Sequence, residues 1–286
     1  DDYLPGVQLP GGISASTDPA EVTEGAEIVI LSVPSQSLRD NLTEWAPLLT
    51  DKIVVSLMKG IELGTTKRMS EVIHEVAGVP AERIGVVSGP NLAREIVQRQ
   101  PAATVVACPD VSAADRVAAA CSTSYFRPYT SQDVVGAELG GAVKNVIALA
   151  VGMAAGLGFG DNTKATLITR GLAETTRLAM ALGADPRTMA GLAGVGDLIA
   201  TCMSPLSRNH SFGVKLGEGL SVAQVTEVTK QTAEGVKSCA SILDLARAHG
   251  VDVPITEMVN RVVHEDFAPA DMVEVLLARA RKHETE

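Results

Sequence analysis

One apolar stretch limits the fold most: residues 138–156, with the sequence ELGGAVKNVIALAVGMAAG. It contains no proline and consists almost wholly of small and aliphatic side chains, so it predicts a helix buried inside the protein. In such a helix the residues three and four positions from Lys144 are all apolar. An ammonium on that face needs a partner, a lowered pKa or a route to the surface. Lys144 is therefore either a group that exchanges protons near neutral pH or a lysine that snorkels or pairs structurally.

The first half of the chain alternates β-rich apolar runs with helical segments. Strands are expected at residues 27–33, 52–58, 83–88, 102–107 and 125–129. Helices are expected at residues 35–49, 65–77, 91–97 and 112–121. This order predicts an α/β fold with a doubly wound parallel sheet. Ligands of such sheets bind beyond the carboxyl ends of the strands.

The second half of the chain shows no convincing strand pattern. Its Ala, Leu and Gly-rich segments predict helices at residues 162–182, 189–203, 222–230, 233–249, 257–267 and 269–282. We therefore expect two domains, a sheet domain at residues 1–135 and an all-helical domain at residues 136–286.

Charge and cysteine usage exclude several classes of function. The formal net charge of −10 argues against binding to nucleic acid or to anionic membranes. The longest uncharged run, residues 146–160, is short for a membrane span, so no membrane insertion is expected. The four cysteines are far apart in the sequence and form no Cys-x-x-Cys pair, which indicates free thiols in a reducing cytoplasm. Neither a disulfide frame nor a zinc site is expected.

Two groups of residues mark a candidate ligand site. Lys59 follows the second predicted strand, where it is either a ligand contact or an ordinary solvated lysine, and the sequence Ser-Gly-Pro-Asn follows the third at residues 88–91. Farther along the chain, Asp197 can cap a helix and shares one helical face with Thr201. Both regions carry side chains suited to a polar ligand.

A local basic patch follows in this acidic protein. Pro205 is expected to end a helix and to present Ser207, Arg208 and Asn209 in a loop, and residues 198–217 contain no acidic side chain. A guanidinium beside amide and hydroxyl groups suits a phosphate. The alternative interpretation is a capped helix followed by an ordinary polar loop.

These segments together closely resemble the bacterial type of NAD(P)-dependent glycerol-3-phosphate dehydrogenase. The resemblance runs from residue 3 to the C-terminal helices. The blocks that carry it are residues 56–62 (SLMKGIE), 89–95 (GPNLARE), 138–145 (ELGGAVKN), 194–201 (GVGDLIAT), 207–209 (SRN) and 232–236 (TAEGV). Five or more such blocks in one order are far more specific than a single glycine motif.

The resemblance implies a Rossmann-type domain and reversible hydride transfer between sn-glycerol 3-phosphate and a nicotinamide cofactor, NAD or NADP, giving dihydroxyacetone phosphate. By that resemblance Lys144 is the proton acceptor. The substrate contacts it implies are Lys59, Gly89, Asn91, Lys144, Asp197, Ser207, Arg208 and Asn209. The cofactor contacts it implies are Lys59, Ala93, Arg208 and Glu234. It implies no metal, a cytoplasmic homodimer formed through the helical domain, and a role in glycerophospholipid synthesis.

One part of the family pattern is not found in these residues. The family opens with a strand, a Gly-x-Gly-x-x-Gly turn and a helix that hold the pyrophosphate, and the second strand of that unit normally sets the choice between NAD and NADP. We expect this unit to precede Asp1 in the natural protein. Two other hypotheses remain at this stage: a related two-domain dehydrogenase with another substrate, and a fragment that folds and dimerises without binding a nucleotide.

Overall fold

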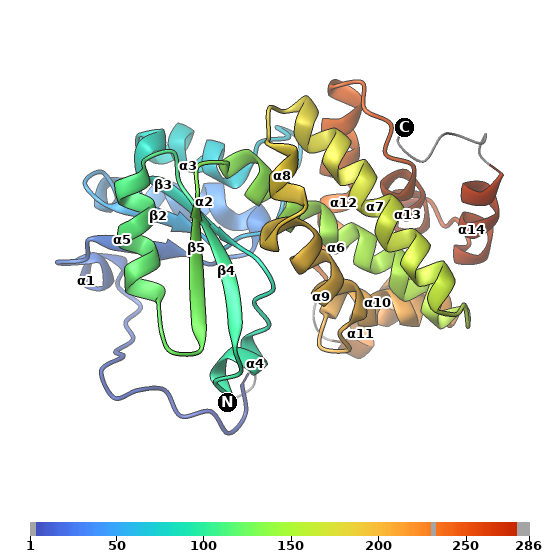
Figure 1. The fold of residues 1–286 in the computed structure, drawn as a ribbon, viewed down its shortest axis with the longest axis horizontal. Helices are drawn as coiled ribbons and strands as arrows, with labels where there is room; N and C mark the ends of the chain where they lie inside the picture. Colours follow the sequence, from blue (N-terminus) through green and yellow to red (C-terminus); the bar gives the residue numbers. More distant parts are fainter. Residues whose placement is uncertain (1–3, 230–232, 279–286) are drawn as a thin grey trace.

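The computed structural model describes residues 4–229 and 233–278. Its two halves lie side by side, with the sheet domain on the left of Figure 1 and the helical domain on the right. Residue 230 and residues 279–282, which were expected to end two helices, lie outside the described residues, as do Tyr3 and Thr232 of the family blocks.

The sheet domain is a five-stranded sheet in the order β1-β2-β3-β4-β5. Its strands are β1 (Ile28–Leu31), β2 (Ile53–Ser56), β3 (Ile84–Ser88), β4 (Ala102–Ala107) and β5 (Phe126–Ser131). Its helices are α1 (Pro19–Thr23), α2 (Leu38–Trp45), α3 (Met69–Ala77), α4 (Ala93–Val97) and α5 (Val111–Cys121). Short 3-10 turns at Ser35–Ser37, Ala46–Leu48 and Ala81–Arg83 complete it. All five strands lie within three residues of their predicted limits.

The sheet differs from the predicted parallel sheet at one pair of strands. β1, β2 and β3 run parallel, and so do β4 and β5, but β3 and β4 are antiparallel. The reason is the connection between β3 and β4, whose only helix is the five-residue α4. A helix of that length spans about 7.5 Å, too short to carry the chain back along a strand of about 16 Å. The chain therefore turns and runs back beside β3.

Alternate side chains of the strands pack on opposite faces of the sheet. Val54 lies in a core formed with α2 and α3, whereas its neighbours Ile53 and Val55 lie in a core formed with α5. This period of two is the pattern of a strand that is buried on both faces.

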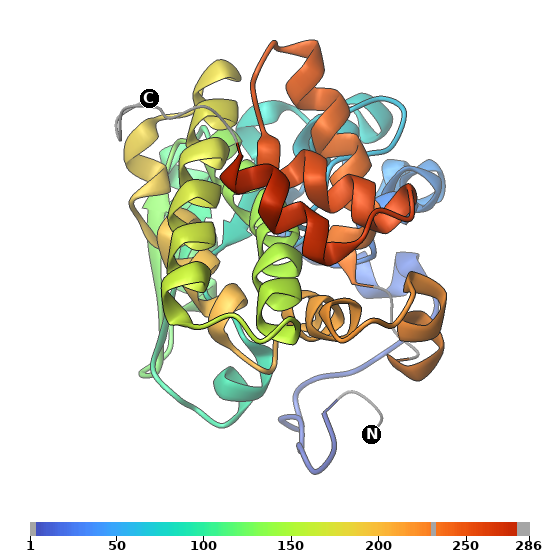
Figure 2. The ribbon, with the colours of Figure 1, turned by 90° about the vertical axis from the view of Figure 1, so that its right-hand side faces the viewer.

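The helical domain is built around α6 (Val134–Gly156), which is the buried helix expected from the sequence. The other helices are α7 (Asp161–Ala181), α8 (Pro186–Met189), α9 (Asp197–Met203), α10 (Arg208–Gly217), α11 (Val222–Thr229), α12 (Glu234–Ala248), α13 (Pro254–His264) and α14 (Pro269–Leu277). Figure 2 shows this domain from its outer side. α6 is long and apolar enough to span a membrane, but here it is the buried core helix of the domain. The predicted domain boundary at residues 135 and 136 falls in its first turn.

Glycines allow α6 and α10 to pack backbone against backbone. A Cβ on Gly152 would lie 2.2 Å from the carbonyl oxygen of His210, and a Cβ on Gly213 would lie 2.3 Å from that of Leu149. Neither contact leaves room for a side chain, so the glycines bring the start of α10 close to the middle of α6. This close packing positions the segment around Arg208 relative to Lys144.

Two predictions about this region were wrong. Residues 189–203 are not one helix, because a π-helical turn at Leu192–Gly196 separates α8 from α9. Ser207, Arg208 and Asn209 do not form a loop. Ser207 is the N-cap of α10, with its Oγ accepting a hydrogen bond of 3.2 Å from the backbone N–H of His210, and the other two begin the helix.

Candidate active site

The buried lysine of α6 has specific partners. The Lys144 ammonium donates hydrogen bonds to Asp197 Oδ1 and, at 2.7 Å, to Thr201 Oγ1. Asp197 and Thr201 lie one turn apart on α9 and face α6 together, as their spacing predicted. All three side chains are buried. Lys144 therefore does not snorkel to the surface.

A second lysine reaches the same carboxylate from the sheet domain. Lys59 follows β2, and its Nζ lies 2.7 Å from Asp197 Oδ2 and 3.2 Å from the carbonyl oxygen of Gly89. Asp197 thus bridges two ammonium groups, one from each domain. The side chain of Lys59 passes over Gly141 of α6, where a Cβ would lie 3.3 Å from Lys59 Cγ and 2.8 Å from Ser88 Oγ. A residue larger than glycine at position 141 would displace this lysine.

The electrostatic surroundings prepare Lys144 to lose its proton. Burial lowers its pKa to about 7, and the positive charge of Lys59 acts in the same direction, while Asp197 opposes both. An amine with a pKa near neutrality can accept and return a proton under ordinary conditions. The nearby thiol of Cys202 stays protonated, because burial raises its pKa to about 12.

A chain of amide groups links the two domains beside the lysines. Asn209 donates to Asn145 Oδ1 at 3.0 Å, and its own Oδ1 accepts from the backbone N–H of Gly235 at 2.9 Å. Asn145 in turn donates to the carbonyl oxygen of Lys59 at 3.4 Å. Asn145 was not among the predicted site residues. The signals for it in the sequence were its position directly after Lys144 and its place at the end of the family block at residues 138–145.

The predicted phosphate-binding residues begin a helix instead of lying in a loop. Arg208 is exposed in the first turn of the ten-residue α10, beside the buried Ser207 and Asn209. A helix N-terminus carries partial positive charge and free backbone N–H groups. The first turn of α10 therefore offers backbone N–H donors for an anion in addition to the guanidinium of Arg208.

The remaining predicted residues lie at the carboxyl edge of the sheet or at the domain junction. Asn91 donates to Thr104 Oγ1 at 2.9 Å, and Ala93 begins α4 with its side chain exposed. Glu234, the first residue of α12, accepts hydrogen bonds from the hydroxyl and, at 3.2 Å, from the backbone N–H of Ser35. Glu234 thus connects the helical domain to the turn that follows β1.

The carboxyl edge of the sheet has polar atoms suited to a nicotinamide cofactor. The hydroxyl oxygen of Ser88 and Oδ1 of Asn91 are buried without a hydrogen-bond partner in the described chain; Ser88 is the last residue of β3, and Asn91 follows three residues later. Buried polar groups normally have partners, so these two are candidates for contacts to a ligand. The residues present therefore fit a cofactor at the edge where doubly wound sheets bind nucleotides.

A separate cleft of about 1100 Å³ lies between α3, the start of α6 and α8, and it includes none of the predicted site residues.

The sequence matches two parts of one family. Residues 1–114 match the family described as NAD-dependent glycerol-3-phosphate dehydrogenase N-terminus, and residues 133–274 match the corresponding C-terminus. A Streptomyces griseus protein named glycerol-3-phosphate dehydrogenase (NAD(P)+) is 65% identical over 284 residues, which cover 99% of this chain and 84% of that protein. The chain belongs to the NAD(P)-dependent glycerol-3-phosphate dehydrogenase family.

Solved structures agree with membership of the glycerol-3-phosphate dehydrogenase family. The glycerol-3-phosphate dehydrogenase of Coxiella burnetii superposes with a TM-score of 0.93 at 35% identity, covering 97% of this chain and 85% of that one. A PanE/ApbA family ketopantoate reductase from Ralstonia eutropha superposes with a TM-score of 0.55 at 17% identity, covering 91% and 81%. The second likeness shows only a shared fold. The predicted family is confirmed, and with it the Rossmann-like domain and the all-helical second domain.

Proposed function

We infer that this chain interconverts sn-glycerol 3-phosphate and dihydroxyacetone phosphate with NAD or NADP as cofactor. The observation that carries this inference is the pair of lysines, one from each domain, that share the buried carboxylate of Asp197. Membership of the glycerol-3-phosphate dehydrogenase family supplies the substrate and the cofactor class.

Lys144 is the proposed proton acceptor. Oxidation of the substrate removes a hydride from C2 and a proton from the C2 hydroxyl, and the bound nicotinamide ring supplies the acceptor for the hydride. The neutral amine of Lys144 takes the hydroxyl proton, and in the reverse direction its ammonium returns a proton to the C2 oxygen. A pKa of about 7 keeps both forms of Lys144 populated near neutral pH.

Lys59 and Asp197 support this proton transfer in different ways. The ammonium of Lys59 stabilises the negative charge that develops on the C2 oxygen. Asp197 holds both Nζ atoms at one place and limits how far their mutual repulsion and burial lower the pKa of Lys144. Thr201 Oγ1, 2.7 Å from Lys144 Nζ, restricts the direction of the amine.

The substrate phosphate is proposed to bind at the start of α10. Arg208, the hydroxyl of Ser207 and the free N–H groups of the first turn provide a charged fork and neutral donors in one place. Asn209 holds the adjacent backbone of Gly235 and so supports this turn. A phosphate fixed there orients C2 toward the lysines.

The cofactor is proposed to lie along the carboxyl edge of β1, β2 and β3. Its expected contacts are Lys59, Ala93, Arg208 and Glu234, and Gly89 and Asn91 are expected to contact the substrate.

We also propose that the chain forms a homodimer through its helical domain, works in the cytoplasm and supplies glycerol 3-phosphate for glycerophospholipid synthesis. Membership of the family supports these points.

The experiment compares dihydroxyacetone phosphate with dihydroxyacetone, which lacks the phosphate, by following loss of NADH and NADPH absorbance. We expect turnover of the phosphorylated substrate, and we expect Arg208→Ala to raise its KM by roughly 10- to 100-fold, the loss of a charge-assisted contact of about 1.5–3 kcal/mol. Lys215→Ala, at the other end of α10, is the matched control and should leave KM nearly unchanged. An unchanged KM in Arg208→Ala would contradict the phosphate assignment. Absence of turnover with either cofactor would contradict the proposed reaction.

A further inference from the structure

Lys59 lies on a loop whose position is set by side chains from both domains. The loop, residues 57–68, connects β2 to α3 and folds back on itself through a bridge between Ile61 and Arg68. The backbone N–H of Glu62 donates to the carbonyl oxygen of Lys67 at 2.9 Å and closes the turn. A lysine has many rotamers, so the placement of its ammonium depends on how firmly this backbone is held.

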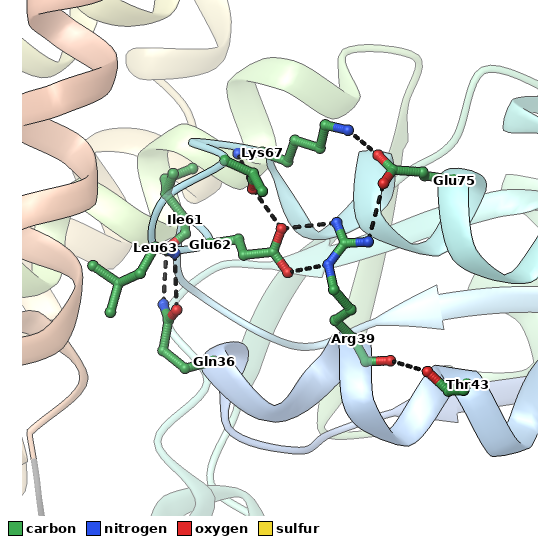
Figure 3. A network of polar contacts seen from close by, with 9 residues as sticks. Gln36, Arg39, Thr43, Ile61, Glu62, Leu63, Lys67 and Glu75 are labelled. Carbon is green, nitrogen blue, oxygen red and sulfur yellow. Dashed lines mark hydrogen bonds and ion pairs between the residues drawn. The ribbon is translucent and has the colours of Figure 1, made fainter.

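Gln36 binds the backbone of the loop at two places, Ile61 and Leu63, which lie two and four residues after Lys59. Its Nε2 donates to the carbonyl oxygen of Ile61 at 2.8 Å, and its Oε1 accepts from the backbone N–H of Leu63 at 2.9 Å. Both contacts are visible in Figure 3, where the amide of Gln36 spans the bend of the loop. One side chain thus satisfies two backbone groups of the loop from the turn that follows β1.

The helical domain holds the same point from the other side. Ser241 of α12 donates to the carbonyl oxygen of Ile61 at 2.9 Å, so this oxygen accepts hydrogen bonds from both domains. The side chain of Ile61 is fully buried, and it belongs to the core of the helical domain although it lies on a loop of the sheet domain. The backbone next to Lys59 is therefore fixed where the two domains meet.

Ion pairs hold the outer side of the loop. The guanidinium of Arg39, from α2, binds both carboxylate oxygens of Glu62 at 2.9 Å, and it also lies 3.0 Å from Glu75 of α3 (Figure 3). The hydrogen bond from Arg39 lowers the pKa of Glu62, so the carboxylate remains charged. These contacts fix the part of the loop that faces away from the helical domain.

We propose that Gln36 is a positioning residue for catalysis: its side-chain amide fixes the loop so that the ammonium of Lys59 lies at the carboxylate shared with Lys144. Gln36 contacts none of the residues proposed to react, so its effect passes through the backbone of residues 61–63. The inference rests on the proposed roles of Lys59 and Lys144. Nothing in the sequence around Gln36 indicated this positioning role.

The test uses Gln36→Asn, which keeps the amide but shortens it by one methylene, so that it cannot reach both Ile61 and Leu63. Gln36→Met is the second variant, with similar length and no hydrogen bonds. The matched control is Asn41→Ala in α2, which removes a hydrogen bond of 2.7 Å to the backbone carbonyl of Ser37 at the start of that helix and makes no contact with the loop. For each protein, kcat, KM and the pH profile of glycerol 3-phosphate oxidation are measured, and folding is checked by thermal unfolding.

We expect both Gln36 variants to lower kcat by about 10- to 100-fold, the scale on which a displacement of about 1 Å lowers rates. The KM for glycerol 3-phosphate should change less than kcat. The acidic limb of the profile should move to higher pH, because a displaced Lys59 lowers the pKa of Lys144 less. A loss of stability alone would not move this limb.

The opposite results would show whether the positioning role of Gln36 or the proposed function itself is wrong. If a folded Gln36→Asn protein kept the kcat and pH profile of the wild type, or if Asn41→Ala lost as much activity, Gln36 would have no positioning role. If Lys59→Met and Lys144→Met also retained full turnover, the proposed function itself would be wrong.

Discussion

The acidity of Lys144 gives the most detailed prediction. Burial and the charge of Lys59 lower its pKa from 10.5 to about 7. In the proposed mechanism, oxidation of glycerol 3-phosphate requires the neutral amine. The neutral fraction is about 3% at pH 5.5 and about 90% at pH 8. We therefore expect kcat/KM for oxidation to rise roughly 30-fold from pH 5.5 and to level off above about pH 8.

The assay measures initial rates of NADH or NADPH formation between pH 5.5 and 9.5 at saturating cofactor. The substrate phosphate also titrates near a pKa of about 6, so the wild type is compared with Asp197→Asn, for which the substrate is the same. The charge of Asp197 raises the pKa of Lys144. Its removal should therefore move the limb to lower pH while lowering kcat.

Two results would refute this reasoning. An acidic limb at pH 9 or above in the wild type would mean that Lys144 keeps an ordinary lysine pKa and that burial does not tune it. A limb that stays in place in Asp197→Asn would mean that the titrating group is not Lys144. The charged and titratable groups that face it are Asp197 and Cys202 from α9 and Lys59 from the loop after β2.

Two further predictions concern stability. Ile61→Ala should lower the free energy of unfolding by about 2–5 kcal/mol, because the side chain is fully buried in the helical core; chemical denaturation measures this, and a loss below about 1 kcal/mol would contradict it. Glu174 accepts bonds from the backbone of Ile255 and Thr256, and burial raises its pKa from 4.5 to about 7. The carboxyl group of Glu174 therefore stays protonated to a higher pH in the native state than in the unfolded state. As pH rises from 4.5 to 7, this difference lowers the free energy of unfolding by about 3 kcal/mol. Glu174→Gln cannot ionise, so the stability advantage of the wild type over this variant should shrink across that range; a constant difference would contradict the assignment.

The sequence predicted those parts of the fold that depend on local periodicity. The five strands and the long helix around Lys144 lie close to their expected positions, because runs of apolar residues mark β1 to β4 and the buried helix directly. The direction of β4 was not predictable in this way, since periodicity is the same for parallel and antiparallel strands. The connection of β3 to β4, with its five-residue helix, decides it.

The candidate active site was predictable only in pieces. The spacing of Asp197 and Thr201 placed them on one face, and the position of Lys59 after a strand placed it at the ligand edge. That these residues meet Lys144 at one carboxylate is a tertiary fact that no local pattern encodes. α10 was missed because Pro205 and the polar residues after it were interpreted as a loop, although Ser207 is a good N-cap.

Amide side chains were the least predictable part. Asn145 and Gln36 act through hydrogen bonds to backbone groups that are distant in the sequence, and neither belongs to a periodic pattern. Only the folded structure shows which backbone groups these two amides bind.

Turnover by Lys144→Met tests the central claim most directly. The variant removes the amine and keeps an unbranched side chain of similar length, which suits the apolar surroundings of α6. We predict that it folds, that it binds dihydroxyacetone phosphate through the turn around Arg208, and that it loses nearly all turnover in both directions. Near-normal turnover by a folded Lys144→Met protein would contradict the account, because the proton of the substrate hydroxyl would then have another acceptor.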